Sequence, residues 1–180
     1  KSNADLIYQT AKRNFIDMRV KEILIQDESP CFYIYRQKMG SQVQTGIVGL
    51  MNAAEYDAWK IKKHELTRKD KEEDRIRHVD TVNAQTGPVF ISYREKQGLN
   101  KIVEQITAGT PEYDFTAEDG VTHTIWVVTD KKQIEEIKKE FSEVDALYIA
   151  DGHHRAAAAT TIARARLAQD KLAGSLKEYE

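Results

Sequence analysis

The feature that most constrains this chain is the junction at residues 147–158, which reads LYIADGHHRAAA. Five residues suited to a buried strand lead into Asp151 and Gly152. An alanine-rich stretch that strongly favours a helix follows Arg155. The junction therefore predicts a strand that turns through a glycine directly into a helix, with polar side chains gathered at the turn.

The remaining segments alternate between helical and strand patterns. Apolar residues at spacings of three and four, together with capping residues, predict helices at 2–22, 53–60, 67–82 and 99–106 and after Asp130. Runs of β-branched and aromatic residues predict strands at 89–93 and 147–150 and hairpins over 31–51 and 113–128. This succession predicts an α+β fold, a mixed α/β sheet domain, rather than a helix bundle or a barrel.

Two segments resemble capping boxes at the start of helices. They are Ser2-x-x-Asp5 and Thr67-x-x-Asp70. The second pattern places His64 and Glu65 in the loop just before a helix N-terminus.

Composition excludes several classes of protein. The chain has 27 lysines and arginines against 29 acidic residues, and the charges are interspersed. This balance does not favour a nucleic-acid or membrane-surface protein. The single Cys31 has no disulfide partner, which predicts a reducing, cytoplasmic location. No apolar run approaches the roughly 18–20 residues that span a bilayer, and the first ten residues do not resemble a signal peptide. The oligomeric state is left open.

The predicted turn has the properties of an anion site. Unpaired N–H groups and the positive end of the helix dipole lie at the carboxyl edge of the strand. Gly152 allows close backbone approach, and Arg155 can donate to phosphate oxygens. Asp151 would orient a histidine, cap the helix or bind Mg²⁺. The alternative interpretation makes Asp151 a simple cap and leaves His153 and His154 on the surface.

A zinc site is a weaker alternative. The five histidines, at positions 64, 78, 123, 153 and 154, form no H-E-x-x-H pattern and have no cysteine nearby. Adjacent histidines usually point in different directions. No metal ligands are therefore predicted.

Three motifs resemble a known family. The segments YIADGHHRAAAA, IKKHELTRKDKEEDR and RQKMGSQVQTGIVGL, taken together, are similar to the DUF1015 proteins. These proteins are relatives of the ParB/sulfiredoxin-like fold, which includes the free serine kinases. The segments KKHELT and IADGHHR resemble the His-Glu-Thr and Asp-Gly-x-His-Arg motifs of those kinases, although Leu66 here separates Glu65 from Thr67.

The resemblance implies a fold, a function and a site. It implies a ParB/sulfiredoxin-like nucleotide-binding core at 61–180, truncated at its C-terminus, after an N-terminal helix and β-hairpin extension at 1–60. It implies a nucleotide-dependent phosphotransferase that converts free L-serine, or a similar hydroxylated metabolite, to a phosphate ester with ATP or ADP and Mg²⁺. The implied catalytic residues are Glu65, as the base, and His64. The implied nucleotide-binding residues are Asp151, Gly152, His153, His154 and Arg155.

Two other functions compete with the kinase. A ParB-like nucleotide-binding regulatory protein without kinase activity is the main alternative. A DNA-binding version of it needs a basic helix-turn-helix after the fold, and the segment ARARLAQDKLAG is a poor candidate. A sulfiredoxin-like reductase needs a cysteine in the phosphate-binding motif, and that motif contains none.

The kinase hypothesis also makes a spatial prediction. Glu65 and Arg155 must face one cleft, although 90 positions separate them. Without the resemblance, Glu65 would be read as a solvated loop acid beside Lys62-Lys63. The segment RKDKEEDR would likewise be read as a solvated helix face, which does not favour a nucleotide contact from Arg68 or Arg75.

Overall fold

The computed structural model describes residues 3–173, which form two compact units. Unit 1 draws on the segments Lys1–Gln26, Met51–Tyr93 and Ala146–Glu180, and unit 2 on Asp27–Leu50 and Arg94–Asp145. The helices are α1 (Asn3–Val20), α2 (Ala53–Asp57), α3 (Lys69–Val82), α4 (Gln97–Thr107), α5 (Lys131–Ser142) and α6 (His153–Ala173). The strands are β1 (Phe32–Met39), β2 (Gln42–Val48), β3 (Ile61–Lys62), β4 (Phe90–Tyr93), β5 (Tyr113–Thr116), β6 (Thr122–Val128) and β7 (Leu147–Asp151).

The mixture of helices with two separate sheets confirms the predicted α+β class. Each predicted helix and hairpin has a counterpart within the described residues. The Ser2 end of the first predicted capping box lies outside them. The ParB/sulfiredoxin-like identity of the core stays a prediction.

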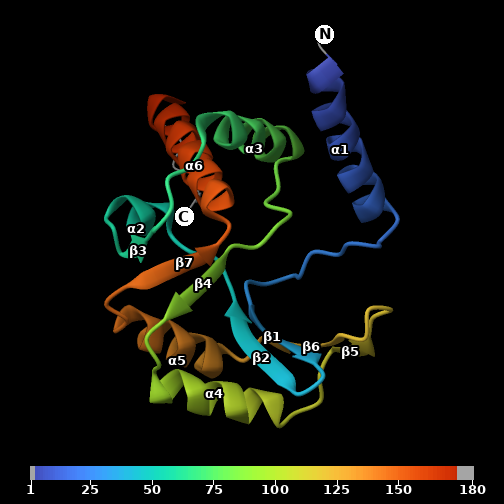
Figure 1. Ribbon diagram of the computed structural model, residues 1–180, viewed down its shortest axis with the longest axis vertical. Coiled ribbons are helices and arrows are strands. Elements are labelled where there is room, and N and C mark those ends of the chain that lie inside the picture. Colours follow the sequence, from blue (N-terminus) through green and yellow to red (C-terminus); the bar gives the residue numbers. More distant parts are fainter. Residues whose placement is uncertain (1–2, 174–180) are drawn as a thin grey trace. The chain divides into compact units, whose positions relative to one another are not determined.

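Unit 1 is built on a three-stranded mixed sheet with the order β3-β7-β4 (Figure 1). The central strand β7 is parallel to β3 and antiparallel to β4. Its inward-facing Leu147 and Ile149 are buried. The sequence predicted a strand at residues 147–150 in a mixed sheet, and this prediction is confirmed.

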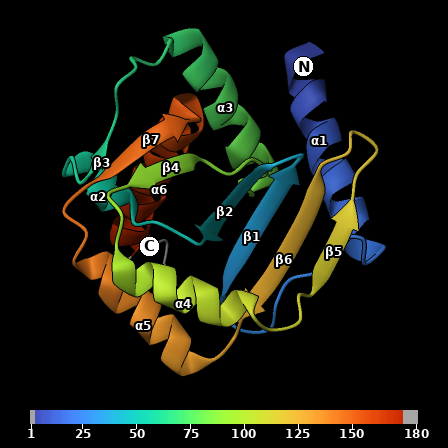
Figure 2. The same ribbon diagram turned by 60° about the horizontal axis from the view of Figure 1, so that its bottom comes forward.

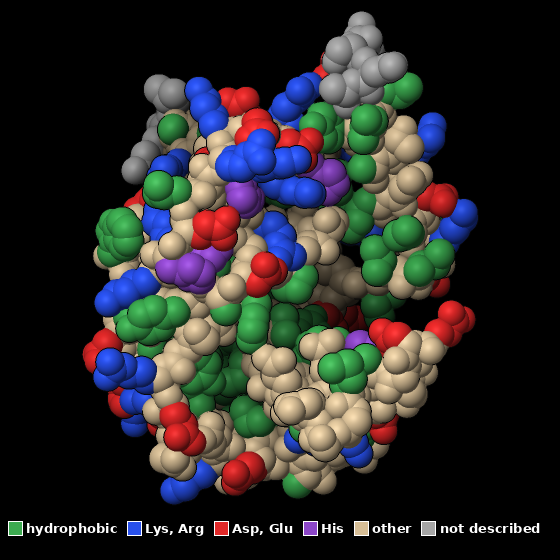
Figure 3. Space-filling model, viewed as in Figure 1, with side chains coloured by type: hydrophobic (Ala, Val, Ile, Leu, Met, Phe, Trp, Pro, Cys, Tyr) green, Lys and Arg blue, Asp and Glu red, His purple; other side chains and the backbone are tan. Residues whose placement is uncertain are grey.

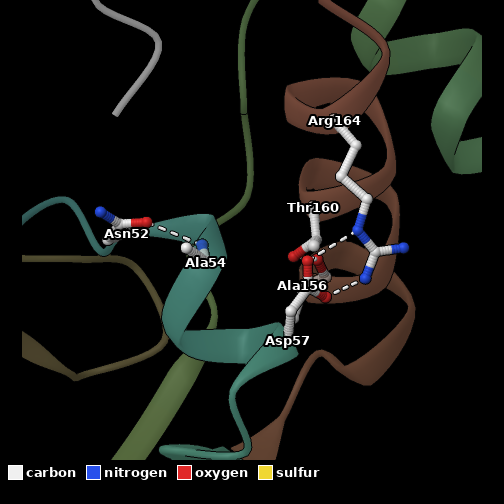
Figure 4. Close-up of polar contacts among 6 residues, drawn as sticks. All are labelled: Asn52, Ala54, Asp57, Ala156, Thr160 and Arg164. Carbon is white, nitrogen blue, oxygen red and sulfur yellow. Dashed lines mark hydrogen bonds and ion pairs between the residues drawn. The ribbon is translucent and has the colours of Figure 1, made fainter. Parts of the chain in front are cut away.

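Helices α3 and α2 pack against the long helix α6 in this unit. Arg164 of α6 donates two hydrogen bonds to the Asp57 carboxylate at the end of α2, one of them 2.8 Å long (Figure 4). The Asn52 side chain caps α2 by accepting a 2.7 Å bond from the Ala54 N–H, and Thr160 donates to the Ala156 carbonyl within α6. The two Arg164–Asp57 bonds hold α2 against the middle of α6.

Helix α1 packs on a different face of α3. Tyr8 donates a 2.6 Å hydrogen bond to Asp74, and this bond raises the pKa of Tyr8. Arg77 pairs with Asp5 at 2.5 Å and also lies over the Tyr8 ring. The rotation of α3 about its axis is thereby fixed by its two helical neighbours.

Unit 2 contains a four-stranded antiparallel sheet with the order β2-β1-β6-β5 (Figure 2). Ile34 of β1 lies opposite Trp126 of β6, and both side chains are buried. Helix α4 contacts both strands and packs against α5. The buried Leu99 of α4 and Ile137 of α5 belong to the same unit.

The two units do not follow the predicted division into 1–60 and 61–180. The predicted extension is divided between the units, because α1 belongs to unit 1 while the hairpin β1–β2 belongs to unit 2. Strand β1 bonds to β2 on one side and to β6 on the other. Local patterns predict the hairpin well but carry no signal for a partner strand about 90 positions away.

Candidate functional site

The β7–α6 turn has the geometry that the sequence predicted. Strand β7 ends at Asp151, and α6 begins at His153. Gly152 between them adopts a φ of 93°, a conformation that side chains with a Cβ rarely adopt. The first N–H groups of α6 therefore lie directly beyond the carboxyl end of the central strand, as an anion site requires.

Arg155 is fixed tightly at this turn. Its Nη2 donates a 2.5 Å hydrogen bond to Asp151 Oδ2. A Cβ built on Gly152 would lie 2.8 Å from Arg155 Nε and Nη2, and one on Gly87 would lie 3.2 Å from Nη1. The guanidinium thus packs against backbone at both glycines. Asp151 orients this arginine, rather than a histidine as the sequence analysis considered.

A cavity of about 680 Å³ opens beside the turn in unit 1. Its volume lies within the range of about 300–1,000 Å³ that is typical of small-molecule sites. Basic and histidine side chains gather over α3 and the start of α6 on this face (Figure 3). The lining residues are Glu65, Arg68, Lys71, Arg75, His78, Val79, Gln85, Thr86, Gly87, Asp151, Gly152, His153, His154 and Arg155.

Two helix N-termini meet at the cavity. Helix α3 begins at Lys69, with Arg68 as its N-cap residue, and α6 begins at His153. The Arg68 backbone N–H donates a 3.1 Å hydrogen bond to His154 Nε2. A side chain from the first turn of α6 thus accepts from the N-cap residue of α3. Both helix dipoles favour negative charge at this end.

The predicted capping box at Thr67 and Asp70 is wrong. Thr67 instead donates a 2.7 Å bond to Glu72, and Arg68 makes no side-chain cap. Asp70 accepts two hydrogen bonds from the Arg68 guanidinium, which lower the pKa of the Asp70 carboxyl. The histidine from α6 instead accepts from the N–H of the N-cap residue, the group that the N3 side chain of a capping box would bind, and sequence spacing alone does not reveal this contact.

Glu65 lies next to a buried histidine. Its Oε2 is 3.6 Å from His153 Nδ1, which is too long for a hydrogen bond but close enough for charge attraction if the ring is protonated. The His153 side chain is only 4% exposed, and its Nε2 has no partner among the described residues. The Glu65 side chain is 60% exposed. The carboxylate is therefore accessible to a ligand while the imidazole behind it is not.

The structure brings together most of the residues that the sequence singled out. Glu65 and Arg155 both line the cavity, as the spatial prediction required. His64 is not among the lining residues; its ring contacts His153 edge-on with the centroids 4.5 Å apart. His153 is buried, which excludes the alternative interpretation that placed it on the surface.

Sequence reasoning missed much of the lining. It weighed Arg68 and Arg75 as solvated residues, although both line the cavity. It also did not select Lys71, His78, Val79, Gln85, Thr86 or Gly87. A usable signal existed for the basic residues, because positions 68, 71, 75 and 78 recur at the spacing of one helix face.

The arrangement can bind anions and can accept a proton. Four cations, from Arg68, Lys71, Arg75 and Arg155, face two lining carboxylates, Glu65 and Asp151. Backbone N–H groups from two helices add further donors. Among residues 3–173, no group of three or more His, Cys, Asp or Glu side chains is arranged to hold a metal ion. In the same range, no helix combines the length and apolar character needed to cross a membrane.

Comparison with known proteins gives one match. No curated protein and no solved structure is similar to the chain. The family model described as "Protein of unknown function (DUF1015)" matches residues 1–180, the whole chain. The chain therefore belongs to the DUF1015 family, as its three motifs predicted.

Proposed function

We propose that this chain is a nucleotide-dependent phosphotransferase that acts on the hydroxyl group of a small metabolite. Free L-serine, converted to O-phosphoserine, is the first candidate, with ATP or ADP and Mg²⁺ as co-reactants. One observation carries the proposal: the exposed Glu65 carboxylate shares a cavity with Arg155 and with the N-termini of two helices. A ParB/sulfiredoxin-like core belongs to the same proposal, and the lone Cys31 supports a cytoplasmic setting for it.

The cavity supplies what phosphoryl transfer requires. The reaction depends mainly on positioning and on charge stabilisation, with a group that accepts the hydroxyl proton. In the proposed step, the substrate hydroxyl oxygen attacks the terminal phosphorus, and the bond from that phosphorus to its bridging oxygen breaks. The hydroxyl proton passes to Glu65, and the nucleotide leaves one phosphate shorter. Arg155 and the N–H groups at the start of α6 contact the phosphate oxygens throughout.

Magnesium fits this cavity as a partner of the nucleotide. When bound, Mg²⁺ would supply neutralisation of the phosphate charge. Asp151 and Glu65 are the carboxylates among the lining residues that could hold it, and one oxygen of Asp151 is already bonded to Arg155. The phosphates and waters would therefore provide most of its ligands.

The test is a direct assay for phosphorylated product. The protein is incubated with Mg²⁺, with ATP or ADP in parallel, and with a panel of free hydroxy amino acids, and products are identified by mass spectrometry. Glu65→Gln keeps the shape of the side chain but removes the proton acceptor. It should lower turnover by about 10²–10⁴-fold while nucleotide binding stays nearly unchanged.

Glu73→Gln is the matched control, because Glu73 is an exposed acid of α3 that does not line the cavity. It should leave turnover unchanged. Nucleotide binding without any phosphorylated product, in the wild type and in Glu65→Gln alike, would refute the kinase and favour a nucleotide-binding regulatory protein.

A further inference from the structure

Helix α3 presents a row of basic side chains to the cavity, which we call the α3 row. Its members are Arg68, Lys71, Arg75 and His78, and all four line the cavity. Their spacing of three or four positions puts them on one helix face. Ten residues of helix extend about 15 Å, at about 1.5 Å per residue. The α3 row is therefore longer than the contact surface of a single phosphate group.

The charges of the α3 row are incompletely neutralised in the free protein. Arg68 pairs with Asp70 at 2.8 Å, but Arg75 lies 4.0 Å from its nearest acid, Asp74. Within the described part of the chain, Lys71 forms no ion pair. Like charges three or four positions apart on a helix repel each other, so the Lys71 ammonium group is repelled by the guanidinium groups of Arg68 and Arg75. An anion bound along the row would relieve this repulsion.

A second set of anion-binding groups lies at the β7–α6 turn. It consists of the Arg155 guanidinium and the first N–H groups of α6. Glu65, the proposed proton acceptor, lies beside this turn through its approach to His153. The reacting phosphoryl group therefore belongs at the turn, which leaves the α3 row for other anionic groups of the same ligand.

We infer that the cavity binds a linear phosphoanhydride chain of two or more phosphates. The turn holds the phosphoryl group to be transferred, and the α3 row holds the phosphates that stay behind. This inference rests on the proposed function for the assignment of the two ends. The chain length that it requires excludes inorganic phosphate or a phosphate monoester as the preferred ligand.

Calorimetric titration at physiological salt tests the inference without any turnover. The ligands are inorganic phosphate, pyrophosphate and tripolyphosphate. Tripolyphosphate should bind at least about tenfold more tightly than phosphate, because one added charge-assisted hydrogen bond is enough for that factor. Lys71→Gln and Arg75→Gln should each weaken tripolyphosphate binding by about tenfold and leave phosphate binding nearly unchanged.

Lys69→Gln is the matched control. Lys69 belongs to the same helix and carries the same charge, but its side chain is 91% exposed and does not line the cavity. It should leave every affinity unchanged. Equal affinities for phosphate and tripolyphosphate in the wild type would overturn the inference. So would equal losses from Lys69→Gln and Lys71→Gln, because those would show a non-specific charge effect.

One further ligand, ATP, identifies the source of the phosphoanhydride. ATP that binds more tightly than tripolyphosphate would make a nucleotide the ligand, and equal affinities would mean that the phosphate chain alone is recognised; either result supports the inference. The outcome is also separable from the proposed kinase activity. Tripolyphosphate binding that depends on Lys71, without any phosphorylated hydroxy amino acid, would refute the kinase and keep this inference. Formation of a phosphorylated hydroxy amino acid, without tighter binding of tripolyphosphate than of phosphate, would keep the kinase and refute this inference.

Discussion

The Arg155 guanidinium is held before any ligand arrives. Asp151 binds its Nη2, and the backbone at Gly152 and Gly87 lies against its faces and edge. A side chain that is already ordered loses little conformational freedom when it binds phosphate. The two glycines matter here for different reasons, since only Gly152 has a positive φ.

Gly152→Ala tests this arrangement. The new Cβ meets both an unfavourable φ and the Arg155 side chain, so we expect a loss of about 1–3 kcal/mol in the free energy of unfolding and weaker ATP binding. Urea unfolding followed by circular dichroism, together with calorimetric titration, measures both effects. Gly46→Ala is the control, because a Cβ there would meet nothing within 4 Å and Gly46 has no positive φ. A Gly152→Ala protein as stable as Gly46→Ala would contradict the proposed packing.

At the scale of elements, the start of α3 depends on a residue of α6. The His154 ring accepts from the N–H of Arg68, the N-cap residue, as the N3 side chain of a capping box would. His154→Ala should therefore lower the free energy of unfolding by about 1 kcal/mol, the usual net contribution of one hydrogen bond. Thr67→Ala should have a smaller effect, because Thr67 binds the Glu72 side chain rather than the N–H groups of the helix. Thermal unfolding of the two variants compares them, and the opposite order would restore Thr67 as the cap.

A second element-level prediction concerns α4 and α5 of unit 2. Lys96, the N-cap residue of α4, donates a 3.0 Å bond to Glu143, the C-cap residue of α5. This bond lowers the pKa of Glu143 below its ordinary value of 4.5. The carboxyl thus binds fewer protons in the folded state than in the unfolded state near that pH. Its contribution to stability is present above about pH 4.5 and is lost as the pH falls through the lower, folded pKa.

Lys96→Met should remove this contribution. We expect the decline of stability below pH 4.5 to become shallower in the variant. Urea unfolding measured at several pH values from about 3 to 6 gives the slope of the free energy of unfolding against pH. The variant and the wild type should differ in this slope by less than about one proton per molecule. Since both groups lie at the surface, raising the salt concentration should reduce the difference between variant and wild type. Identical pH slopes at low salt would show that the pair is not formed.

Local sequence patterns predicted the elements of the site better than their mutual arrangement. The β7–α6 turn was predictable because an Asp-Gly pair between an apolar run and an alanine-rich run restricts the backbone within a few residues. The spacing of the α3 row is visible in the sequence, but its place in the cavity was not predictable, because which face of α3 meets the cavity depends on the neighbours of this helix. The Tyr8 bond to Asp74 and the 3.3 Å approach of Arg166 to Asp80 turn the other faces toward α1 and α6.

At the scale of the whole molecule, the order of the chain does not match the order of its units. Unit 1 takes three separate segments and unit 2 takes two. The boundary at residue 60 was instead what the family resemblance implied. The pairing of β1 with β6 crosses that boundary, and such a distant pairing leaves no local trace.

The fragment 61–180 distinguishes the predicted division at residue 60 from the two compact units. It lacks β1, so β6 loses one of its two neighbours and the buried Trp126 loses its cross-strand partner Ile34. We expect the fragment to fail to form the native unit 2, with Trp126 exposed to water. Tryptophan fluorescence measures this, because Trp126 is the single tryptophan of the fragment, and the whole chain used for comparison carries Trp59→Phe so that Trp126 alone reports there too. A fragment with the emission maximum and the cooperative unfolding of the whole chain would restore the boundary at residue 60.

The sheet order β3-β7-β4 has a consequence for synthesis on the ribosome. Strands β3 and β4 do not pair with each other. Both pair with β7, which is synthesised after all of unit 2. A nascent chain that has reached residue 145 therefore carries every segment of unit 2 but no strand partner for β3 or β4. The lining of the cavity includes residues 151–155, so the cavity forms only after the start of α6 has been synthesised. A ligand of this cavity therefore cannot assist the folding of the earlier part of the chain.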